Sequence, residues 1–141
     1  MSEGVLPAKP PTALVIDDNV DACRITKMAL ESIGYEVTTF EDSSEGLEFL
    51  NWMTFDLMIL DLMMPKIDGA TILRQVREMP LHRSLRVIVL SANVRVASSQ
   101  ITELANYVLY KPIDVPSFVK LAQRLKEQPE DEAKPEKAGG I

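Results

Sequence analysis

The residues of this sequence best suited to chemistry are polar groups that directly follow apolar runs. Carboxylates follow two of these runs, a hydroxyl group follows a third, and an ammonium group follows a fourth. A charged carboxylate next to the apolar stretch LMIL is costly unless it is paired or bound to a cation, so it requires a partner. In chain order the groups are Asp17 and Asp18 after 12–16, Asp61 after 57–60, Ser91 after 86–90, and Lys111 after 107–110.

Carboxylates, an ammonium group and a hydroxyl gathered in one place suit divalent metal binding and phosphoryl transfer. Close carboxylates repel one another and drive one of them toward protonation. A hard cation such as Mg²⁺, which prefers oxygen ligands, removes that conflict. A carboxylate beside Mg²⁺ and an ammonium group can attack phosphorus and become an aspartyl phosphate. Lys111 and the Ser91 hydroxyl would then stabilise phosphoryl oxygens.

Each of these residues also has a simpler interpretation. An acidic pair after a strand can cap the next helix, since Asp and Asn are favoured N-cap residues, and Asp61 alone can do the same. Ser91 can be a turn residue, and Lys111 can be a solvated cation. These interpretations do not explain why such groups follow strand after strand in one chain, so we favour a shared site.

The composition indicates one domain of ordinary size between two disordered terminal segments. The chain has 141 residues, of which 46% are hydrophobic, and a net charge of −6, which argues against a nucleic-acid surface. The single cysteine, Cys23, excludes an intrachain disulfide and favours a reducing compartment, and we expect it to pack in a helix. Residues 1–11 and 127–141 are rich in proline, glycine and charge, and are expected to be disordered tails.

The sequence shows no signal for a membrane or for export. No apolar run reaches the roughly 18 residues of a membrane span. The first residues lack the basic and apolar regions of a signal peptide. We therefore expect a cytoplasmic protein without a membrane partner.

Five segments have the patterns of β-strands. Four are apolar runs, and the segment 35–40 alternates as a strand at the edge of a sheet does. Buried strands separated by helices indicate a parallel sheet covered on both faces. The apolar strands are expected at 12–16, 55–60, 86–90 and 107–110.

Helical patterns fill the intervals between these strands. The first helix carries Ala22, Ile25, Ala29 and Ile33 at spacings of three and four, and Gly34 follows as its C′ residue. The second opens with a capping box, and the last has proline in its first turn. These later helices are expected to begin at Asp42, at Asp68, near residue 95 and at Asp114.

Five alternating βα units with right-handed crossovers give a doubly wound α/β sandwich. In such folds ligands bind at the carboxyl ends of the strands, near the point where the strand order reverses. The polar groups named above would all lie on that one edge. We therefore expect Asp61 to face the other carboxylates at the carboxyl ends of the strands rather than to lie alone in the core.

Four short motifs make the chain similar to the receiver domains of two-component response regulators. They are VIDDN at 15–19, LDLMMPKIDG at 60–69, LSA at 90–92 and YKP at 110–112. The resemblance covers residues 12–126 and implies a flavodoxin-like fold whose five parallel strands have the order 2-1-3-4-5. It also implies signalling by phosphorylation with Mg²⁺ as cofactor. The phosphoryl donor would be a sensor histidine kinase or a histidine phosphotransfer protein.

The resemblance implies a role for each matching residue. Asp61 would be the phospho-acceptor, Ser91 the switch hydroxyl, and Lys111 the lysine of the phosphoryl site, followed by a cis bond to Pro112. The Mg²⁺ ligands would be Asp18 and Asp61 directly, Asp17 through water, and the backbone carbonyl of Met63.

One position departs from the pattern of the family. Receiver domains carry Tyr or Phe three residues before the lysine, and here Val108 stands there. Valine is too small and too stiff at χ1 to swing between two positions. Strand alternation puts Tyr110 on the face of Val108, whereas a register shift would bring Tyr107 there. We therefore expect the response to phosphorylation around 93–96, in the fourth helix and its flanking loop.

Other functions stay open from the sequence alone. Phosphatases of the haloacid dehalogenase type also form an aspartyl phosphate, but they need Asp–x–Asp after the first strand, where this chain has Asp17–Asp18–Asn19. An interaction module that has lost phosphorylation, and a receiver fragment of a larger hybrid kinase or regulator, are two further alternatives. His82, the one histidine, is expected in a loop and not as a phosphoryl donor. We favour a stand-alone receiver that is not an enzyme and that binds an unidentified downstream protein, not nucleic acid.

Overall fold

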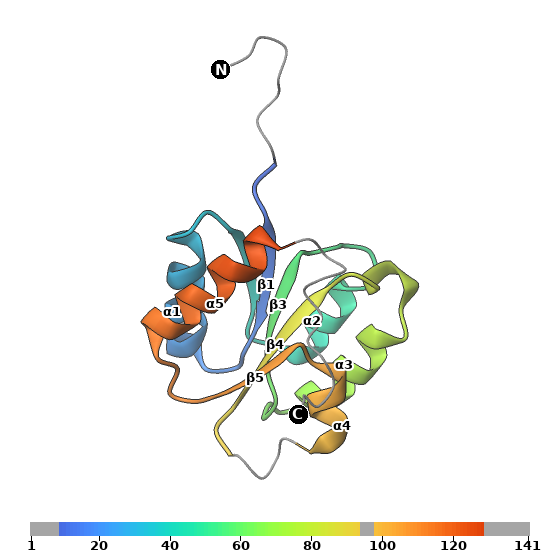
Figure 1. Cartoon of the computed structure of the whole chain (residues 1–141). Helices are drawn as coiled ribbons and strands as arrows, with labels where there is room; N and C mark the ends of the chain where they lie inside the picture. The colour runs from blue at the N-terminus through green and yellow to red at the C-terminus, as the bar shows by residue number, and fades with distance from the viewer. Residues whose placement is uncertain (1–8, 94–97, 129–141) are drawn as a thin grey trace, which may run out of the picture.

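The computed structural model describes residues 9–93 and 98–128. Within them, parallel strands form one five-stranded sheet in the order β2-β1-β3-β4-β5, which confirms the predicted topology (Figure 1). From one edge to the other the strands are β2 (Glu36–Phe40), β1 (Thr12–Ile16), β3 (Leu57–Asp61), β4 (Arg86–Ser91) and β5 (Tyr107–Tyr110).

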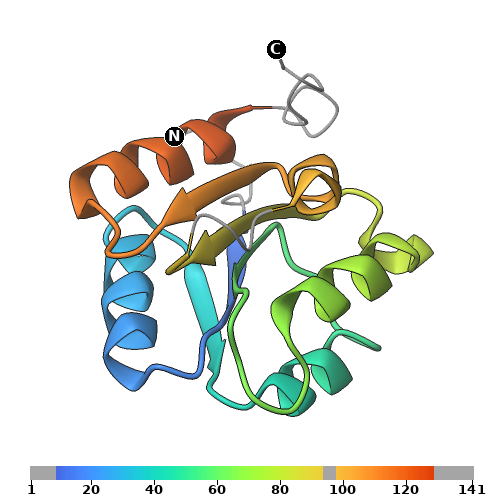
Figure 2. The same ribbon diagram turned by 90° about the horizontal axis from the view of Figure 1, so that it is seen from below.

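Helices cover both faces of this sheet (Figures 1 and 2). Helices α1 and α5 lie on one face, and α2, α3 and α4 lie on the other. Within the described ranges, none of the helices combines the length and the apolar character that a membrane span requires. Their bounds are α1 (Val20–Glu31), α2 (Ser43–Phe49), α3 (Gly69–Arg77), α4 (Ser99–Leu104) and α5 (Val115–Glu127), with a short 3₁₀ helix η1 (Pro80–His82) before β4.

Burial on both faces explains why the central strands are continuous apolar runs. All five residues of β3 are buried. Along β1, Ala13 and Val15 pack into the core cluster beneath α1 and α5, whereas Leu14 and Ile16 pack into the cluster beneath the other helices. Each such strand therefore needs apolar side chains at every position and not at alternate ones.

The apolar stripe predicted for helix α1 is confirmed at Ala29 and wrong at Ile25. The predicted stripe included Ala22 and Ile25, but Ile25 is 47% exposed. The buried residues are Cys23, Thr26, Ala29 and Leu30, of which Ala29 belongs to the predicted stripe. The burial of Cys23 confirms the packing role expected for it. The core face includes Thr26, which the apolar pattern does not mark, because its methyl group can fill a core position at 1% exposure.

Two strands extend one residue beyond their predicted ends, and both extensions concern the candidate site. β3 ends at Asp61 rather than at residue 60, and β4 ends at Ser91 rather than at residue 90. The reason is the register, in which Asp61 pairs with Leu90 and Ser91 pairs with Tyr110. The neighbouring strand thus holds the backbone of both polar residues.

The fourth helix and the end of the last helix also differ from prediction. Helix α4 begins at Ser99 with Ser98 as its N-cap, so the start predicted near residue 95 falls among residues 94–97, outside the described residues. Helix α5 runs to Glu127, one residue past the predicted domain end, because Arg86 donates to the carbonyls of Leu125 and Gln128 there. The tails proposed at 1–11 and 127–141 otherwise stay a prediction.

His82 is not the loop residue that was expected. It is the last residue of η1 and is 2% exposed. Its Nε2 atom donates to the carbonyl of Leu50, 2.6 Å away, at the end of α2. A buried ring that closes a helix end has a structural role, which agrees with its exclusion as a phosphoryl donor.

Candidate phosphoryl and metal site

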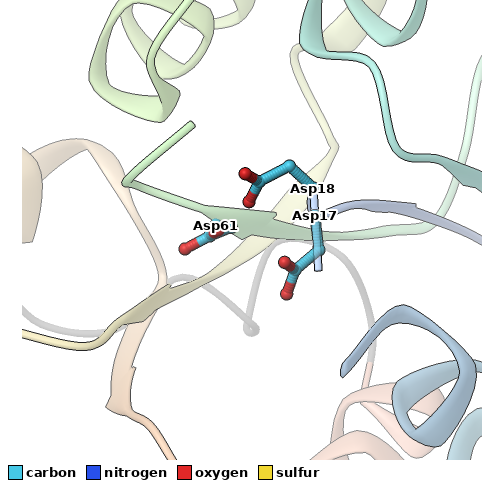
Figure 3. A group of neighbouring side chains, drawn as sticks. All are labelled: Asp17, Asp18 and Asp61. Atoms are coloured by element: carbon cyan, nitrogen blue, oxygen red, sulfur yellow. The ribbon is translucent and has the colours of Figure 1, made fainter. Parts of the chain in front are cut away.

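The acidic cluster lies at the carboxyl ends of β1 and β3 (Figure 3). Asp17 directly follows β1 and is buried, Asp61 ends β3 and is buried, and Asp18 is exposed. One carboxylate oxygen from each of the three lies within 4.8 Å of the others. The two strands are neighbours with Ile16 opposite Leu60, and this register brings residues from distant parts of the sequence together.

Asn19, rather than either aspartate, caps helix α1. Its side-chain oxygen accepts a hydrogen bond of 2.8 Å from the Ala22 amide. Asp17 accepts a bond of 3.0 Å from the Asn19 amide through Oδ1, which leaves Oδ2 for the cluster. The simpler interpretation of the acidic pair as a helix cap is therefore wrong.

Strand β5 delivers Lys111 to the same edge. Its Nζ atom lies 3.0 Å from Asp17 Oδ2 and 3.6 Å from Asp61 Oδ2. Its amide donates to the Ser91 carbonyl at 2.8 Å, which fixes Lys111 beside the end of β4. The peptide bond to Pro112 is cis, as the resemblance implied. One ammonium group thus faces two buried carboxylates, with Asp18 as a third acid alongside.

The pKa of the Asp61 carboxyl is raised well above its usual range, mainly because burial removes the carboxylate from water. The negative charge of Asp17 raises it further. Lys111 and the Met63 amide, which donates to Asp61 Oδ1 at 3.4 Å, lower this pKa but do not cancel the rise. The site therefore holds more negative charge than Lys111 alone can neutralise.

The donor set fits Mg²⁺. The three carboxylates supply hard oxygen atoms, and Mg²⁺ needs only a few of these because it keeps several waters. Asp17 Oδ2 is buried and forms the ion pair with Lys111, but it has no hydrogen bond with the residues the structure describes. Met63 follows in the loop that leaves β3, which puts its carbonyl in the same segment of chain as Asp61.

The Ser91 hydroxyl is at the predicted edge but is engaged within its own loop. It donates to the Asn93 carbonyl at 2.7 Å and accepts from the Asn93 amide at 3.1 Å. Ser91 is fully buried. The structure thus brings the residue to the site edge, but its proton does not point at the carboxylates.

A tight loop connects Asp61 to helix α3. A side chain at Gly69 would place its Cβ 2.2 Å from the Asp61 carbonyl oxygen, so only glycine allows this close return of the chain. The Gly69 amide also donates to the Leu62 carbonyl at 3.0 Å. Asp68 caps α3 by accepting from the Thr71 amide at 2.9 Å, which confirms the predicted cap.

The aromatic residues of β5 follow the simple alternation. Tyr107 packs with the cluster beneath α1 and α5, whereas Val108 packs with the opposite cluster. The register shift that would have moved Tyr107 to the face of Val108 is therefore wrong. Tyr110 shares the parity of Val108, is 45% exposed, and lies opposite Ser91 in the register.

Sequence reasoning missed Ser43, which reaches the loop after Asp61. Its hydroxyl bonds the backbone of Pro65 and Ile67, which are 22 and 24 residues further along the chain. Its local pattern indicated only the start of a helix. No signal in the sequence connects it with Asp61.

Comparison with known proteins agrees with this fold and site. The sequence profile of the response regulator receiver domain matches residues 13–123. The DNA-binding transcriptional regulator NtrC of Escherichia coli K12 is 34% identical over 112 residues, which cover 78% of this chain and 24% of NtrC. An uncharacterized 14.6 kDa protein of Leptolyngbya boryana is 31% identical over 113 residues, which cover 79% of this chain and 86% of that protein. The chain thus spans about a quarter of the length of NtrC.

Solved structures are similar over most of the fold. A putative response regulator from Chloroflexus aurantiacus has a TM-score of 0.76 at 29% identity, covering 85% of this chain and 100% of that one. The response regulator TrrA of Thermotoga maritima, in complex with Mg²⁺ and BeF, has a TM-score of 0.74 at 26% identity, covering 82% of this chain and 98% of that one. From its sheet order, its acidic strand edge and these matches, the chain belongs to the response regulator receiver domain family of two-component signalling proteins.

Proposed function

We propose that this chain accepts a phosphoryl group on Asp61 from a histidine kinase or a histidine phosphotransfer protein. The observation that carries the proposal is the position of Lys111, whose Nζ lies 3.6 Å from Asp61 and 3.0 Å from Asp17. A cation held against a buried carboxylate at the strand edge can receive the negative oxygens of an arriving phosphoryl group. The chain would then act as a phosphorylated signalling protein and not as an enzyme that turns over a substrate.

Mg²⁺ is the cofactor of this proposal. Asp17, Asp18 and Asp61 would hold it, with the backbone carbonyl of Met63 as a further oxygen donor. The bound cation would neutralise phosphoryl charge and favour the ionised, nucleophilic form of Asp61. The raised pKa of Asp61 supports this cofactor, because Lys111 alone does not offset the burial of the carboxylate and the charge of Asp17 beside it.

In the proposed step, an Asp61 oxygen forms a bond to the phosphorus while the bond from phosphorus to the donor's imidazole nitrogen breaks. The electron pair of the broken bond stays with that nitrogen, which takes a proton from water. Lys111 would donate to one phosphoryl oxygen. The Ser91 hydroxyl would exchange its bond to the Asn93 carbonyl for a bond to another phosphoryl oxygen.

A groove beside the site supports a protein as the phosphoryl donor. It has a volume of about 530 Å³ and lies between α1 and the start of α5, with Lys111 in its wall. Its apolar wall includes Ile25 and Val115, which are 47% and 37% exposed. Burying these side chains would stabilise a complex with a protein surface, whereas a small phosphorylated metabolite would not cover them.

We propose that the output is the binding of a downstream protein. Ser91 lies opposite Tyr110 in the register, so movement of the Ser91 hydroxyl changes the contacts beside a partly exposed ring. The response expected around 93–96 falls mostly on residues outside the described ranges. The net charge of −6 supports a protein partner over nucleic acid. DNA binding is the property named for NtrC, a much longer protein.

The test is phosphorylation by acetyl phosphate with Mg²⁺, followed by intact mass spectrometry. We expect the addition of one phosphoryl group to the wild-type chain and none to Asp61→Asn. Asp56→Asn is the matched control, since Asp56 precedes the other end of the same strand, and it should be labelled like the wild type. Labelling that persists in Asp61→Asn would overturn the assignment.

A second arm separates the donor from the acceptor. Ile25→Ser should slow transfer from a phosphorylated histidine phosphotransfer domain and leave labelling by acetyl phosphate unchanged. Equal slowing with both donors would contradict a protein-docking role for the groove. Labelling of neither the wild type nor Asp56→Asn would favour the interaction module without phosphorylation.

A further inference from the structure

The loop after Asp61 is fixed at both of its ends. The Leu62 amide donates to the Leu90 carbonyl at 3.0 Å, and the Gly69 amide donates to the Leu62 carbonyl at 3.0 Å. Met64, inside the loop, is 9% exposed and packs into the core. The path of the tip, residues 65–67, therefore depends on contacts that come from outside the loop.

Ser43 supplies such contacts. It is the first residue of α2 and is 2% exposed. Its hydroxyl donates to the Pro65 carbonyl at 2.9 Å and accepts from the Ile67 amide at 3.1 Å. Because both partners are backbone groups, Ser43 fixes the path of the chain at the tip and not the orientation of one side chain.

Lys66, between these two partners, has an unfavourable backbone conformation. Its φ angle is 69°, in the left-handed region that residues other than glycine rarely adopt. Such a conformation persists only where the surrounding structure determines it strongly. The hydrogen bonds of Ser43 hold the chain on each side of Lys66 and so provide that determination.

A second contact with the tip, an ion pair between Lys66 and Asp42, is more exposed to solvent than the Ser43 hydrogen bonds. Lys66 Nζ lies 2.5 Å from Asp42 Oδ2, and their side chains are 59% and 27% exposed. Exposed ion pairs contribute little to stability because water and salt screen them and long side chains lose freedom. Of these two polar contacts with the loop, the one made by the Ser43 hydroxyl is therefore the buried one.

We propose that Ser43 is a positioning residue for the phosphoryl site, an inference that rests on the function proposed for Asp61. Asp61 and the Met63 carbonyl are two residues apart on the same segment, so a shift of the tip would move one oxygen donor relative to the other. Mg²⁺ demands nearly ideal octahedral geometry. Loss of the Ser43 hydroxyl should thus weaken Mg²⁺ binding and slow phosphoryl acceptance in a chain that is still folded.

The first measurement is a Mg²⁺ titration followed by the backbone amide NMR signals of Asp18 and Met63. We expect Ser43→Ala to raise the Mg²⁺ dissociation constant roughly tenfold, as a displaced ligand geometry would. Ser43→Thr keeps the hydroxyl and should restore the affinity to within about twofold of the wild type. Ser44→Ala is the matched control, because its hydroxyl contacts Asp42 and not the loop, and it should bind like the wild type.

The second measurement is the rate of labelling by acetyl phosphate at saturating Mg²⁺ in the same variants. Slower labelling in Ser43→Ala than in Ser43→Thr supports positioning, since saturating metal removes the affinity effect. Lys66→Gly provides a further check because glycine adopts a positive φ freely. Ser43→Ala should lose less Mg²⁺ affinity in the Lys66→Gly background, and this double variant also carries the test if Ser43→Ala alone does not fold.

The outcomes separate this inference from the proposed function. Wild-type Mg²⁺ affinity and labelling rate in Ser43→Ala, or an equal loss in Ser44→Ala, would overturn the positioning role while Asp61 remains the acceptor. Absence of labelling in the wild type would overturn the proposed function. A Mg²⁺ affinity that still depends on the hydroxyl at position 43 would then support Ser43 as a positioning residue of the metal site alone.

Discussion

Charged groups are paired differently at the two ends of the parallel strands. The carboxyl ends of the strands are called the carboxyl edge below, and their amino ends the amino edge. At the carboxyl edge, Asp17, Asp61 and Lys111 lie close together, and burial together with the charge of Asp17 raises the pKa of Asp61. At the amino edge, the half-buried Arg77 and the buried Arg86 bond carbonyl oxygens and a side-chain amide instead of carboxylates.

Arg77, at the end of α3, shows how the amino edge is satisfied. It donates to the carbonyls of Leu104 and Leu85 at 2.8 and 2.7 Å, and to the Asn106 side-chain oxygen at 2.9 Å. The same Asn106 oxygen accepts from the Val87 amide at 2.8 Å. One guanidinium group thus ties the end of α4 and the starts of β4 and β5 to α3.

The difference between the edges separates stability from function. Hydrogen bonds at the amino edge close helix ends that would otherwise leave carbonyls unpaired. The carboxyl edge keeps a charge imbalance that either a bound cation or a proton on Asp61 relieves. We therefore expect changes at Arg77 to alter folding and changes at Asp61 to alter chemistry.

The largest expected effect on stability comes from Arg77→Met. It leaves the carbonyls of Leu85 and Leu104 without their donor and should lower the free energy of unfolding by about 3 kcal/mol. Urea unfolding measures this loss, and the folded fraction should still be labelled by acetyl phosphate. Arg74→Met, on the exposed side of the same helix, is the control and should cost less than about 0.5 kcal/mol. Equal stability of the two variants would contradict the contrast between the edges.

A smaller effect of opposite sign is expected for Asp61→Asn without metal. The pKa of Asp61 is raised from 3.8 to about 7, so the folded wild type holds a proton that the unfolded chain releases between these values. The contribution of the Asp61 carboxyl to the free energy of unfolding is therefore fully present below pH 4 and is lost as the pH rises through 7. The neutral variant lacks this loss and should be more stable than the wild type at pH 8 by on the order of 2 kcal/mol.

The measurement is urea unfolding with a chelator at pH 4, 6 and 8. The advantage of Asp61→Asn should shrink toward pH 4, where the wild-type carboxyl is protonated when folded. Asp56→Asn, at the amino end of the same strand, should show no gain at pH 8. A constant difference between the wild type and Asp61→Asn at all three pH values would contradict the charge imbalance.

Mg²⁺ should stabilise the folded protein through the carboxyl edge alone, which distinguishes the two edges further. Binding to the folded state raises the free energy of unfolding by about 1.4 kcal/mol at ten times the dissociation constant. Thermal melting with and without millimolar Mg²⁺ measures it, with Na⁺ at matched ionic strength as control. Arg74→Met should respond like the wild type, whereas Asp18→Asn should respond less. An unchanged melting temperature in the wild type would count against a formed metal site.

The smallest expected effect concerns the lifetime of the phosphoryl group. Met63, two residues after Asp61, is apolar and 52% exposed, so it cannot orient an attacking water. We expect slow hydrolysis, and Met63→Asn should shorten the lifetime about fivefold, which is roughly 1 kcal/mol in the barrier. A decay time course by intact mass is the measurement. Met28→Asn, exposed on α1, is the control, and equal decay in both variants would refute the idea.

The sequence by itself determined which chemical groups meet at the carboxyl edge. Asp17, Asp61 and Lys111 each follow a strand that its apolar pattern identifies, and parallel strands with right-handed crossovers put such positions on one edge. The caps at Asp42, Asp68 and Asp114 were predictable because aspartate is a favoured N-cap residue before a helical pattern. Each depends on a pattern within a few residues, which the sequence displays directly.

The tertiary structure alone decided what depends on contacts between distant segments. It orients α1 so that Thr26 is buried and Ile25 is exposed. The periodicity of the helix does not predict this orientation, because it does not identify the elements against which the helix packs. It also placed Ser43 on the loop after Asp61 and Arg77 across three elements. A hydroxyl or guanidinium group has no pattern that identifies its partner, so only the packed chain determines which backbone groups it bonds.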